Sequence, residues 1–160
     1  MSEVAIANHQ EEQADNSVKF VTFLLGGESY AVHASSVDEV LRHTEITPVP
    51  GSPSFVLGII NLRGDVLTVI DTREVFGLQP EEPSSHSRIV VVELEDYSVG
   101  ILVDRVAEVV DLYETNIEPS PNTGNERAAM FIQGVYHYEN ELLVLVDFDN
   151  ITALAQGAVF

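Results

Sequence analysis

The chain of 160 residues contains no cysteine, one lysine and no long apolar run. Without cysteine there is no disulfide framework, and no thiolate is available as a metal ligand or a nucleophile. No stretch approaches the roughly 20 apolar residues that cross a bilayer, and the N-terminus lacks the basic and apolar regions of a signal peptide. We therefore expect a cytoplasmic protein.

Positive charge is scarce. Lysine and arginine number 7 against 26 acidic residues, which gives a formal net charge of −19. Such a surface repels phosphate backbones and anionic lipids, so it argues against nucleic-acid binding and direct membrane insertion. Two explanations of the acidity stay open. Self-repulsion keeps a protein soluble, and a protein adapted to a high-salt cell uses that salt to screen the repulsion.

The sequence also lacks the common motifs of catalysis and metal binding. It contains no Walker loop, no GxGxxG and no GxSxG. Five histidines fall in five separate segments, with no pair at ligand spacing: His9, His33, His43, His86 and His137. We therefore predict no catalytic residue, no metal site and no cofactor.

Three aspartates could be imagined as an acid–base set: Asp71, Asp104 and Asp147. Each follows an apolar, β-branched run, where helix capping or a turn is the expected role of an aspartate. A remote enzymatic alternative is a small β-barrel hydrolase that uses Asp71 with a histidine. No histidine stands at a loop position near Asp71 to support that alternative.

The stretch GIINLRGDVLTVIDTREVFGL (58–78) predicts a β-hairpin that runs into a short helix. Two apolar, largely β-branched runs flank Arg63 and Gly64, and Gly64 can adopt the positive φ of a tight turn. Asp71 is a natural N-cap, with Glu74 three residues on in a pattern that resembles a capping box. Folding leaves Arg63 unexplained, so it is either a solvated turn residue or part of a binding surface.

The same layout returns near the C-terminus. In 58–71 and again in 134–147, a glycine precedes an aspartate by 13 positions, with apolar strands between them. Upstream, VDEV (37–40) corresponds to VAEV (106–109) in the same order. Two similar copies in the same order predict an internal duplication.

The organisation of the chain follows from these patterns. We expect a disordered acidic tail over 1–17, a single domain over 18–154 and a C-terminal tail over 155–160. The duplication divides the domain into halves of roughly 18–82 and 83–154, between which strands can be exchanged.

Short apolar runs at regular spacing predict nine or ten strands with two small helices, an all-β chain that forms small β-barrels. We further expect Ser35 and Ser36 to cap a helical turn over 37–40, a strand over 46–49, and a closing helix over 147–154 with Asp147 as its N-cap.

The run GIINLRGDVLTVIDTR (58–73) resembles the signature of CheW-like chemotaxis coupling proteins. VDEV (37–40) and GILVDxV (100–106) match the same family at the same spacings, so the resemblance covers nearly the whole chain. It departs at Thr68, where the family usually has proline, and at Thr72, where leucine is usual.

The resemblance implies an adaptor with no active site, folded as two SH3-like five-stranded β-barrels. Family members bind the regulatory domain of a CheA-type histidine kinase and the cytoplasmic tip of chemoreceptors, in arrays at the membrane. The receptor-binding residues would be Val37, Glu39, Arg63, Gly100, Val106 and Val109. The kinase-binding residues would be Ile46, Thr47, Val49, Leu57 and Gly58.

Two further expectations follow. Glu39 and Arg63 carry opposite charges and could meet across a groove, where an isolated surface pair would add little stability. A CheW-like adaptor of a non-flagellar pathway, such as that of a type IV pilus, would carry the same signature, and neighbouring genes rather than the sequence would distinguish it.

Overall fold

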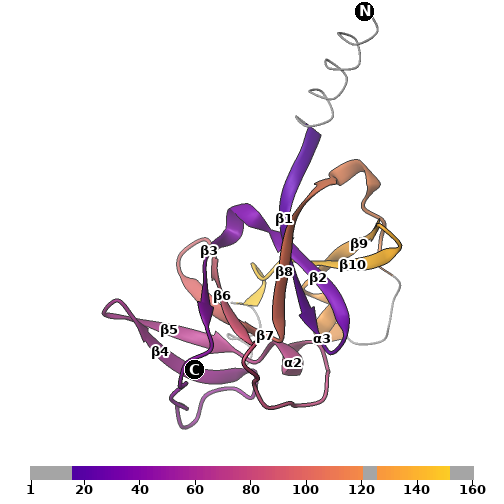
Figure 1. Cartoon of the computed structure of the whole chain (residues 1–160). Helices are drawn as coiled ribbons and strands as arrows, with labels where there is room; N and C mark the ends of the chain where they lie inside the picture. Colours follow the sequence, from indigo (N-terminus) through magenta and orange to yellow (C-terminus); the bar gives the residue numbers. More distant parts are fainter. Residues whose placement is uncertain (1–15, 121–125, 152–160) are drawn as a thin grey trace, which may run out of the picture.

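The computed structural model describes residues 16–120 and 126–151, which form two five-stranded sheets (Figure 1). Sheet A has the order β8 (Arg105–Tyr113), β1 (Ser17–Leu25), β2 (Glu28–His33), β10 (Glu141–Val146) and β9 (Ile132–Tyr138). Sheet B has the order β3 (Val37–Arg42), β6 (Arg88–Glu93), β7 (Ser98–Val103), β5 (Asp65–Ile70) and β4 (Val56–Leu62). The helical segments are short: η1 (Ala34–Ser36), α2 (Thr72–Val75), η2 (Glu114–Asn116) and α3 (Glu126–Ala129). The all-β class with short helices is confirmed.

The two sheets are copies of each other with strands exchanged. When β1 to β5 are matched in order with β6 to β10, the strand order of sheet A becomes that of sheet B. The pairing register agrees as well. In sheet B, Val37 lies opposite Val92. The equivalent residues of sheet A, each 69 positions away, are Val106 and Phe23, and they also lie opposite each other. A register shift follows at the same place in both pairs. Each sheet therefore takes strands from both halves of the sequence.

Each sheet closes on itself through one isolated bridge between its two edges. Beyond the end of β3, Thr47 pairs with Ile59 of β4, with N–H to oxygen distances of 2.9 Å in both directions. Beyond β8, Glu118 pairs with Val135 of β9 at 2.9 and 2.8 Å. Because β3 and β4 are the edges of sheet B, and β8 and β9 those of sheet A, these bridges join opposite edges.

A glycine makes each closure possible. A Cβ at Gly58 would lie 2.2 Å from the carbonyl oxygen of Thr47, and one at Gly134 would lie 2.5 Å from that of Glu118. Gly58 also has φ +153°, a conformation that residues with side chains rarely adopt. The repeated glycine of the sequence is thus a site of close backbone approach.

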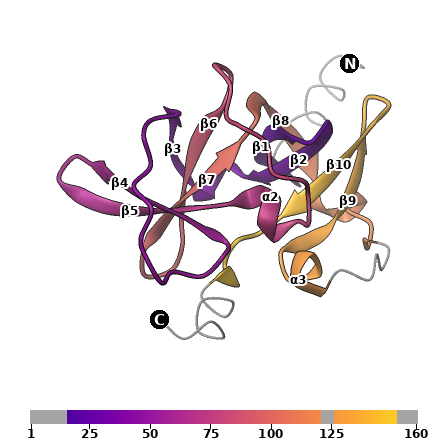
Figure 2. The same cartoon turned by 90° about the horizontal axis from the view of Figure 1, so that it is seen from below.

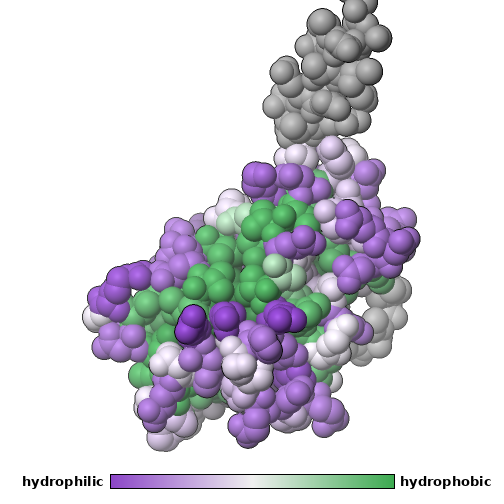
Figure 3. Space-filling view, viewed as in Figure 1, coloured by the Kyte–Doolittle hydropathy of each residue, from purple (hydrophilic) through white to green (hydrophobic). Residues whose placement is uncertain are grey.

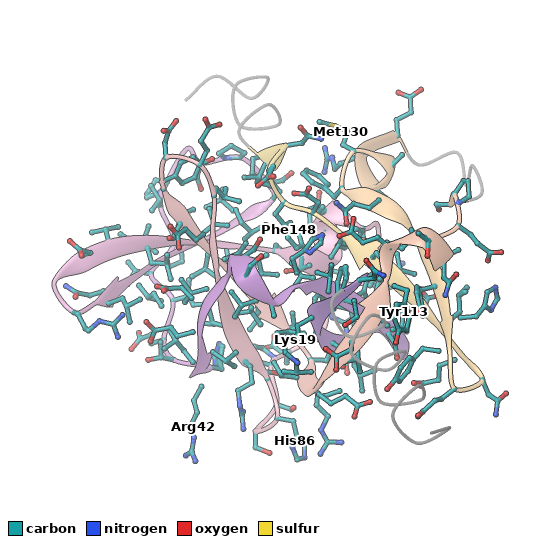
Figure 4. All side chains as sticks on the ribbon, turned by 90° about the horizontal axis from the view of Figure 1, so that it is seen from above. Lys19, Arg42, His86, Tyr113, Met130 and Phe148 are labelled. Atoms are coloured by element: carbon teal, nitrogen blue, oxygen red, sulfur yellow. The ribbon has the colours of Figure 1, made fainter. Side chains whose placement is uncertain are left out.

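The core has three parts, and the largest lies between the sheets. It joins β1, β2, β6 and β7 with α2 and the segment after β10, and it contains Phe23, Tyr30 and Phe148. Figure 2 shows α2 between the two sheets, and Figure 4 shows Phe148 near the centre of the molecule. Tyr30 stacks on Phe23 with ring centroids 5.7 Å apart, and its burial, aided by the charge of Glu28, raises its pKa to about 12.

The first predicted hairpin and helix are confirmed. β4 and β5 pair antiparallel, and α2 follows at Thr72. The Asp71 carboxylate caps α2 by accepting a hydrogen bond from Glu74 N at 3.2 Å. The capping box is only half formed, because Asp71 N donates instead to the Phe55 carbonyl at 2.7 Å.

Two predictions before β4 are wrong. The segment over 37–40 is part of β3 rather than a helical turn, because its backbone pairs with β6 and its side chains alternate between half-buried and exposed. The expected strand over 46–49 is reduced to the single bridge at Thr47. Pro48 and Pro50 have no N–H to extend a ladder.

The closing helix is also corrected. Asp147 accepts a hydrogen bond from Asp149 N at 2.8 Å, which is a local turn two residues long rather than a helix cap. Residues 148–150 are not helical, a helix begins only at Ile151, and 152–154 lie outside the described residues. The predicted tails lie outside them too, except for Asn16 and for Ser17, which already belongs to β1. Within the described residues, no helix is long and apolar enough to cross a membrane.

Candidate functional site

Arg63 is presented by a two-residue turn at the tip of the β4–β5 hairpin. Arg63 and Gly64 both have positive φ, 52° and 89°, which is the geometry of the tight turns that suit twisted hairpins. The Asn61 side chain fixes the turn by accepting a hydrogen bond from Gly64 N at 3.0 Å. The sequence indicated the glycine of this turn but gave no sign that Arg63 also takes a left-handed conformation.

The expected meeting of Arg63 and Glu39 is confirmed. The guanidinium binds the carboxylate through two contacts, Nη1 to Oε1 at 3.1 Å and Nη2 to Oε2. This hydrogen bonding, with the charge of Arg63, holds the pKa of Glu39 below its usual range, and Glu39 raises the pKa of Arg63 in turn. The Arg63 side chain remains 68% exposed and that of Glu39 26% exposed, so a partner can reach the pair.

An apolar surface includes residues of β3 and β8, and β3 also carries Glu39. Val37 and Val106 occupy equivalent positions of the two strands, and both are half-buried against the core between the sheets. Val40 and Val109 are also equivalent, and they are more open, at 42% and 59% exposure. Figure 3 shows the resulting apolar area on the front of the molecule, where Figure 1 places β3 and β8. We call this surface the front face.

Val40 was not among the predicted binding residues. The signal that could have found it was in the sequence, because Val40 of VDEV corresponds to Val109 of VAEV. The structure brings Val37, Val106 and Val109 to the front face, and it places the Glu39–Arg63 pair on β3 and the hairpin tip.

Gly100 differs from the other predicted receptor-binding residues, because it is buried in β7. A Cβ on Gly100 would lie 2.8 Å from Ile89 Cγ2 and 3.2 Å from Leu67 Cδ2. Its role is to let the side chains of the neighbouring strands pack above it. A partner cannot touch it directly.

The predicted kinase-binding residues gather around the bridge that closes sheet B. Ile46 and Leu57 are half-buried against the core of sheet B, while Thr47 and Val49 are exposed. Ile46 and Leu57 also line a pocket of about 470 Å³. Gly58 is buried, and its part is the close approach to Thr47. We call this region the bridge edge.

A polar network lines the same pocket as Ile46 and Leu57 of the bridge edge. Arg73 of α2 is only 12% exposed, and it donates to Asp104 at 3.3 Å and to the Gln79 carbonyl at 2.8 Å. Asp104 in turn accepts from Gly26 N at 2.9 Å, which ties the β1–β2 turn to the start of β8. Asp104 lies in the bend between β7 and β8, and its carboxylate also connects that bend to the β1–β2 turn.

The acidic residues and histidines of the described part of the chain form no metal-binding cluster. No group of three or more His, Asp and Glu side chains is placed there to hold a metal ion. Asp71 is engaged in capping α2. The arrangement instead offers two surfaces, the front face and the bridge edge, both of which involve sheet B.

Comparison with known proteins agrees with this geometry. The family model of the CheW-like domain matches residues 19–156. The chemotaxis protein CheW of Rhizobium meliloti is 30% identical over 146 residues, which cover 91% of this chain and 94% of that protein. Protein PilI of Pseudomonas aeruginosa is 30% identical over 140 residues, covering 84% of this chain and 75% of that protein.

A solved structure shows the same fold. The crystal structure of the scaffolding protein TtCheW from Thermoanaerobacter tengcongensis matches with a TM-score of 0.77 and 34% sequence identity. The match covers 84% of this chain and 87% of that one.

Proposed function

The chain belongs to the CheW-like family, and we propose that it is a chemotaxis adaptor that couples chemoreceptors to a CheA-type histidine kinase in a cytoplasmic array. The observation that carries the assignment of sites is the exposed Glu39–Arg63 pair beside an apolar surface built from two equivalent strands. A surface pair of this kind adds little to stability. A role in binding a partner would explain why the Glu39–Arg63 pair is present.

In this proposal the front face binds the receptor tip. Val37, Val106 and Val109 supply apolar contact, and an apolar surface flanked by charges suits an amphipathic helix. Arg63 reaches the partner from the hairpin tip, held in place by Glu39. Gly100 contributes through packing, because a side chain there would displace Ile89 of β6, the strand next to β3.

The bridge edge binds the regulatory domain of the kinase. Thr47 and Val49 are exposed on an irregular segment that follows the edge strand β3. Because Thr47 already pairs with Ile59 in both directions, this segment offers a partner its exposed side chains rather than unpaired strand backbone. Ile46, Leu57 and Gly58 set the shape of this edge rather than provide most of the contact area.

The mechanism follows from the position of the two surfaces on one sheet. β3 carries part of the front face and leads directly into the bridge edge. A receptor and a kinase bound at these places are held at a fixed distance and angle. A change of receptor state can then bias the kinase through differential contacts, without any chemistry in the adaptor.

The receptor assignment is tested with Arg63→Ala. We expect binding of a cognate receptor cytoplasmic fragment to weaken at least about thirtyfold, since a charge-assisted interface contact is lost. Binding of the kinase regulatory domain should persist. Arg127→Ala is the matched control, because Arg127 is an exposed arginine paired with a carboxylate, that of Glu74. Unchanged receptor affinity in Arg63→Ala would refute the assignment, and equal loss of both partners would indicate misfolding instead.

The kinase assignment is tested with Val49→Asp. Val49 is 38% exposed and belongs to no hydrogen-bonded strand, so the fold should tolerate the change. We expect loss of binding to the kinase regulatory domain with retained receptor binding. The reverse pattern would exchange the two surfaces.

A second candidate function has one observation in its favour, the identity to Protein PilI. In this candidate the adaptor serves a non-flagellar chemosensory pathway. Copurification from cells that swim and from cells that move by other means identifies the kinase and receptors it joins.

A further inference from the structure

Three of the seven basic residues have no acidic partner within the described part of the chain. Lys19, Arg63, Arg73 and Arg127 each lie within 4.0 Å of a carboxylate. The other three are Arg42, Arg88 and Arg105, and no ion pair is formed by any of them there. With 26 acidic residues in the chain, this absence of pairing is unexpected.

Two of the three arginines are direct cross-strand neighbours, and the third follows closely along the chain from the residue opposite one of them. Arg42 at the end of β3 is directly opposite Arg88 at the start of β6. Arg88 is also directly opposite Val103 of β7, and Arg105 begins β8 two residues later. Opposite residues of antiparallel strands have Cα atoms about 4.5–5.5 Å apart. We call Arg42, Arg88 and Arg105 the arginine row.

The arginine row is open to solvent and borders the front face. Arg42 and Arg105 are exposed, and Arg88 is half-buried and donates to the carbonyls of Ser85 and Ser87 at 3.0 and 2.8 Å. Figure 4 shows Arg42 extending from the same edge of the molecule as His86. In Figure 3, strongly hydrophilic side chains border the lower side of the apolar area. Arg42 lies two residues after Val40 on β3, so both point to the same side of the strand.

The other half of the molecule has a different pair of charges at the equivalent positions. Arg42 and Arg88 correspond, 69 positions away in each case, to Asp111 and Lys19. Lys19 and Asp111 are also directly opposite each other, and they form an ion pair at 3.0 Å. Opposite charges across two strands stabilise a sheet and like charges destabilise it. One copy of the duplicated unit therefore carries the stabilising pair, and the other carries the destabilising one.

We propose that the arginine row is an anion-binding subsite that receives carboxylates of the receptor segment on the front face. This inference rests on the proposed function. The occupant is an acidic, amphipathic helical segment with apolar side chains against Val40 and carboxylates over Arg42 and Arg88. Arginine suits this role because its planar fork binds carboxylates through two hydrogen bonds.

Charge favours an acidic protein segment over a larger polyanion. The net charge of −19 repels a nucleic acid or an anionic bilayer as a whole. A short segment with two or three carboxylates interacts mainly with the nearby positive charges of the arginine row rather than with the negative charge of the whole molecule. In an acidic molecule, such a positive spot also orients the approaching partner and raises its rate of association.

The test is Arg42→Asp, which copies the charge pattern of the other half by placing an aspartate opposite Arg88. We expect binding of the cognate receptor cytoplasmic fragment to weaken at least about tenfold at low salt, and its dependence on salt to decrease. Binding of the kinase regulatory domain should change less than about twofold. The thermal midpoint should stay equal or rise, because a like-charge pair becomes an opposite-charge pair.

Lys19→Asp is the matched control, because it makes the same change in net charge at the strand position equivalent to Arg88. Receptor binding of this variant should stay close to that of the unmodified protein. Unchanged receptor affinity in Arg42→Asp, an equal loss in both variants, or a loss of kinase binding alone would each overturn the proposal. If the unmodified protein binds neither partner, the proposed function itself fails, which is a different outcome.

Discussion

The two halves of this molecule have the same backbone plan and different side chains on it. Sheets A and B share strand order, register shifts, a closing bridge and a close glycine contact. They differ at the charged cross-strand pair, where Lys19 faces Asp111 and Arg42 faces Arg88. Features that both halves keep are required by the fold. Features that only one half has are candidates for function.

The hairpin tips illustrate the same division. Arg63 and Gly64 both have positive φ, and so do Glu139 and Asn140 at the equivalent turn. The backbone geometry is therefore retained while the side chains are free to change. Sheet B places there an arginine that pairs with Glu39 of its edge strand, and sheet A places a glutamate.

The largest effect is expected from the glycines that close the sheets. Gly58→Ala and Gly134→Ala should each lower the free energy of unfolding by at least about 3 kcal/mol, because the new methyl group meets a backbone carbonyl that cannot turn away. Gly58→Ala should be the worse, since only Gly58 has a positive φ, at +153°. Urea unfolding of both variants measures the difference. Near-neutral effects would mean that the closing bridges are not required.

A smaller effect, of opposite sign, is expected at the first residue of α2. Thr72 is fully buried and its Oγ1 has no hydrogen-bond partner among the described residues, whereas the equivalent position holds the buried Phe148. Thr72→Val keeps the shape and removes the unsatisfied hydroxyl, so it should stabilise the protein by about 1–2 kcal/mol. Thr72→Ser is the control and should destabilise. A loss of stability in Thr72→Val would show that the hydroxyl is satisfied in solution.

The next effect is a difference in stability cost between variants of the two aspartates that follow the hairpins. Asp71→Ala removes a helix cap and should cost about 0.5–2 kcal/mol. Asp147→Ala should cost less. The Asp147 carboxylate accepts only a hydrogen bond within a local turn. The pKa of Asp149 is raised first by its own burial and then by the negative charge of Asp147, so removing that charge also relieves a repulsion. Chemical unfolding of the two variants compares them, and equal costs would restore a capping role for Asp147.

These comparisons show what the sequence could and could not reveal. The hairpins, the cap at Asp71 and the duplication were predictable because they depend on local turn chemistry and on apolar periodicity. The strand over 37–42 was not, because its short polar and apolar pattern fits a helical turn until β6 is there to pair with it. Glu39 and Arg63 were recognised as a pair from charge and family resemblance. The arginine row was missed, because Arg42 and Arg88 become neighbours only through strand register.

Added salt should change the thermal stability of both halves of the molecule together. If the charge of −19 reflects adaptation to high salt, the midpoint of thermal unfolding should rise by a few degrees, corresponding to about 1 kcal/mol, from low to molar KCl. Potassium glutamate in place of KCl controls for the anion. A flat profile would leave solubility as the explanation of the acidity.

The smallest effect concerns the two charged pairs themselves. Lys19 and Asp111 are well exposed, so their attraction should contribute only about 0.2–1 kcal/mol, and the repulsion between Arg42 and Arg88 should cost a similar amount. At low salt, Arg42→Asp should therefore raise the free energy of unfolding and Lys19→Asp should lower it, although both make the net charge equally more negative. Molar KCl should bring the two variants together, because it screens attraction and repulsion alike. Calorimetry at both salt concentrations measures the four values. If Arg42→Asp were destabilising at low salt, the arginines would already be satisfied within the folded chain, and the difference between the halves would be structural rather than functional.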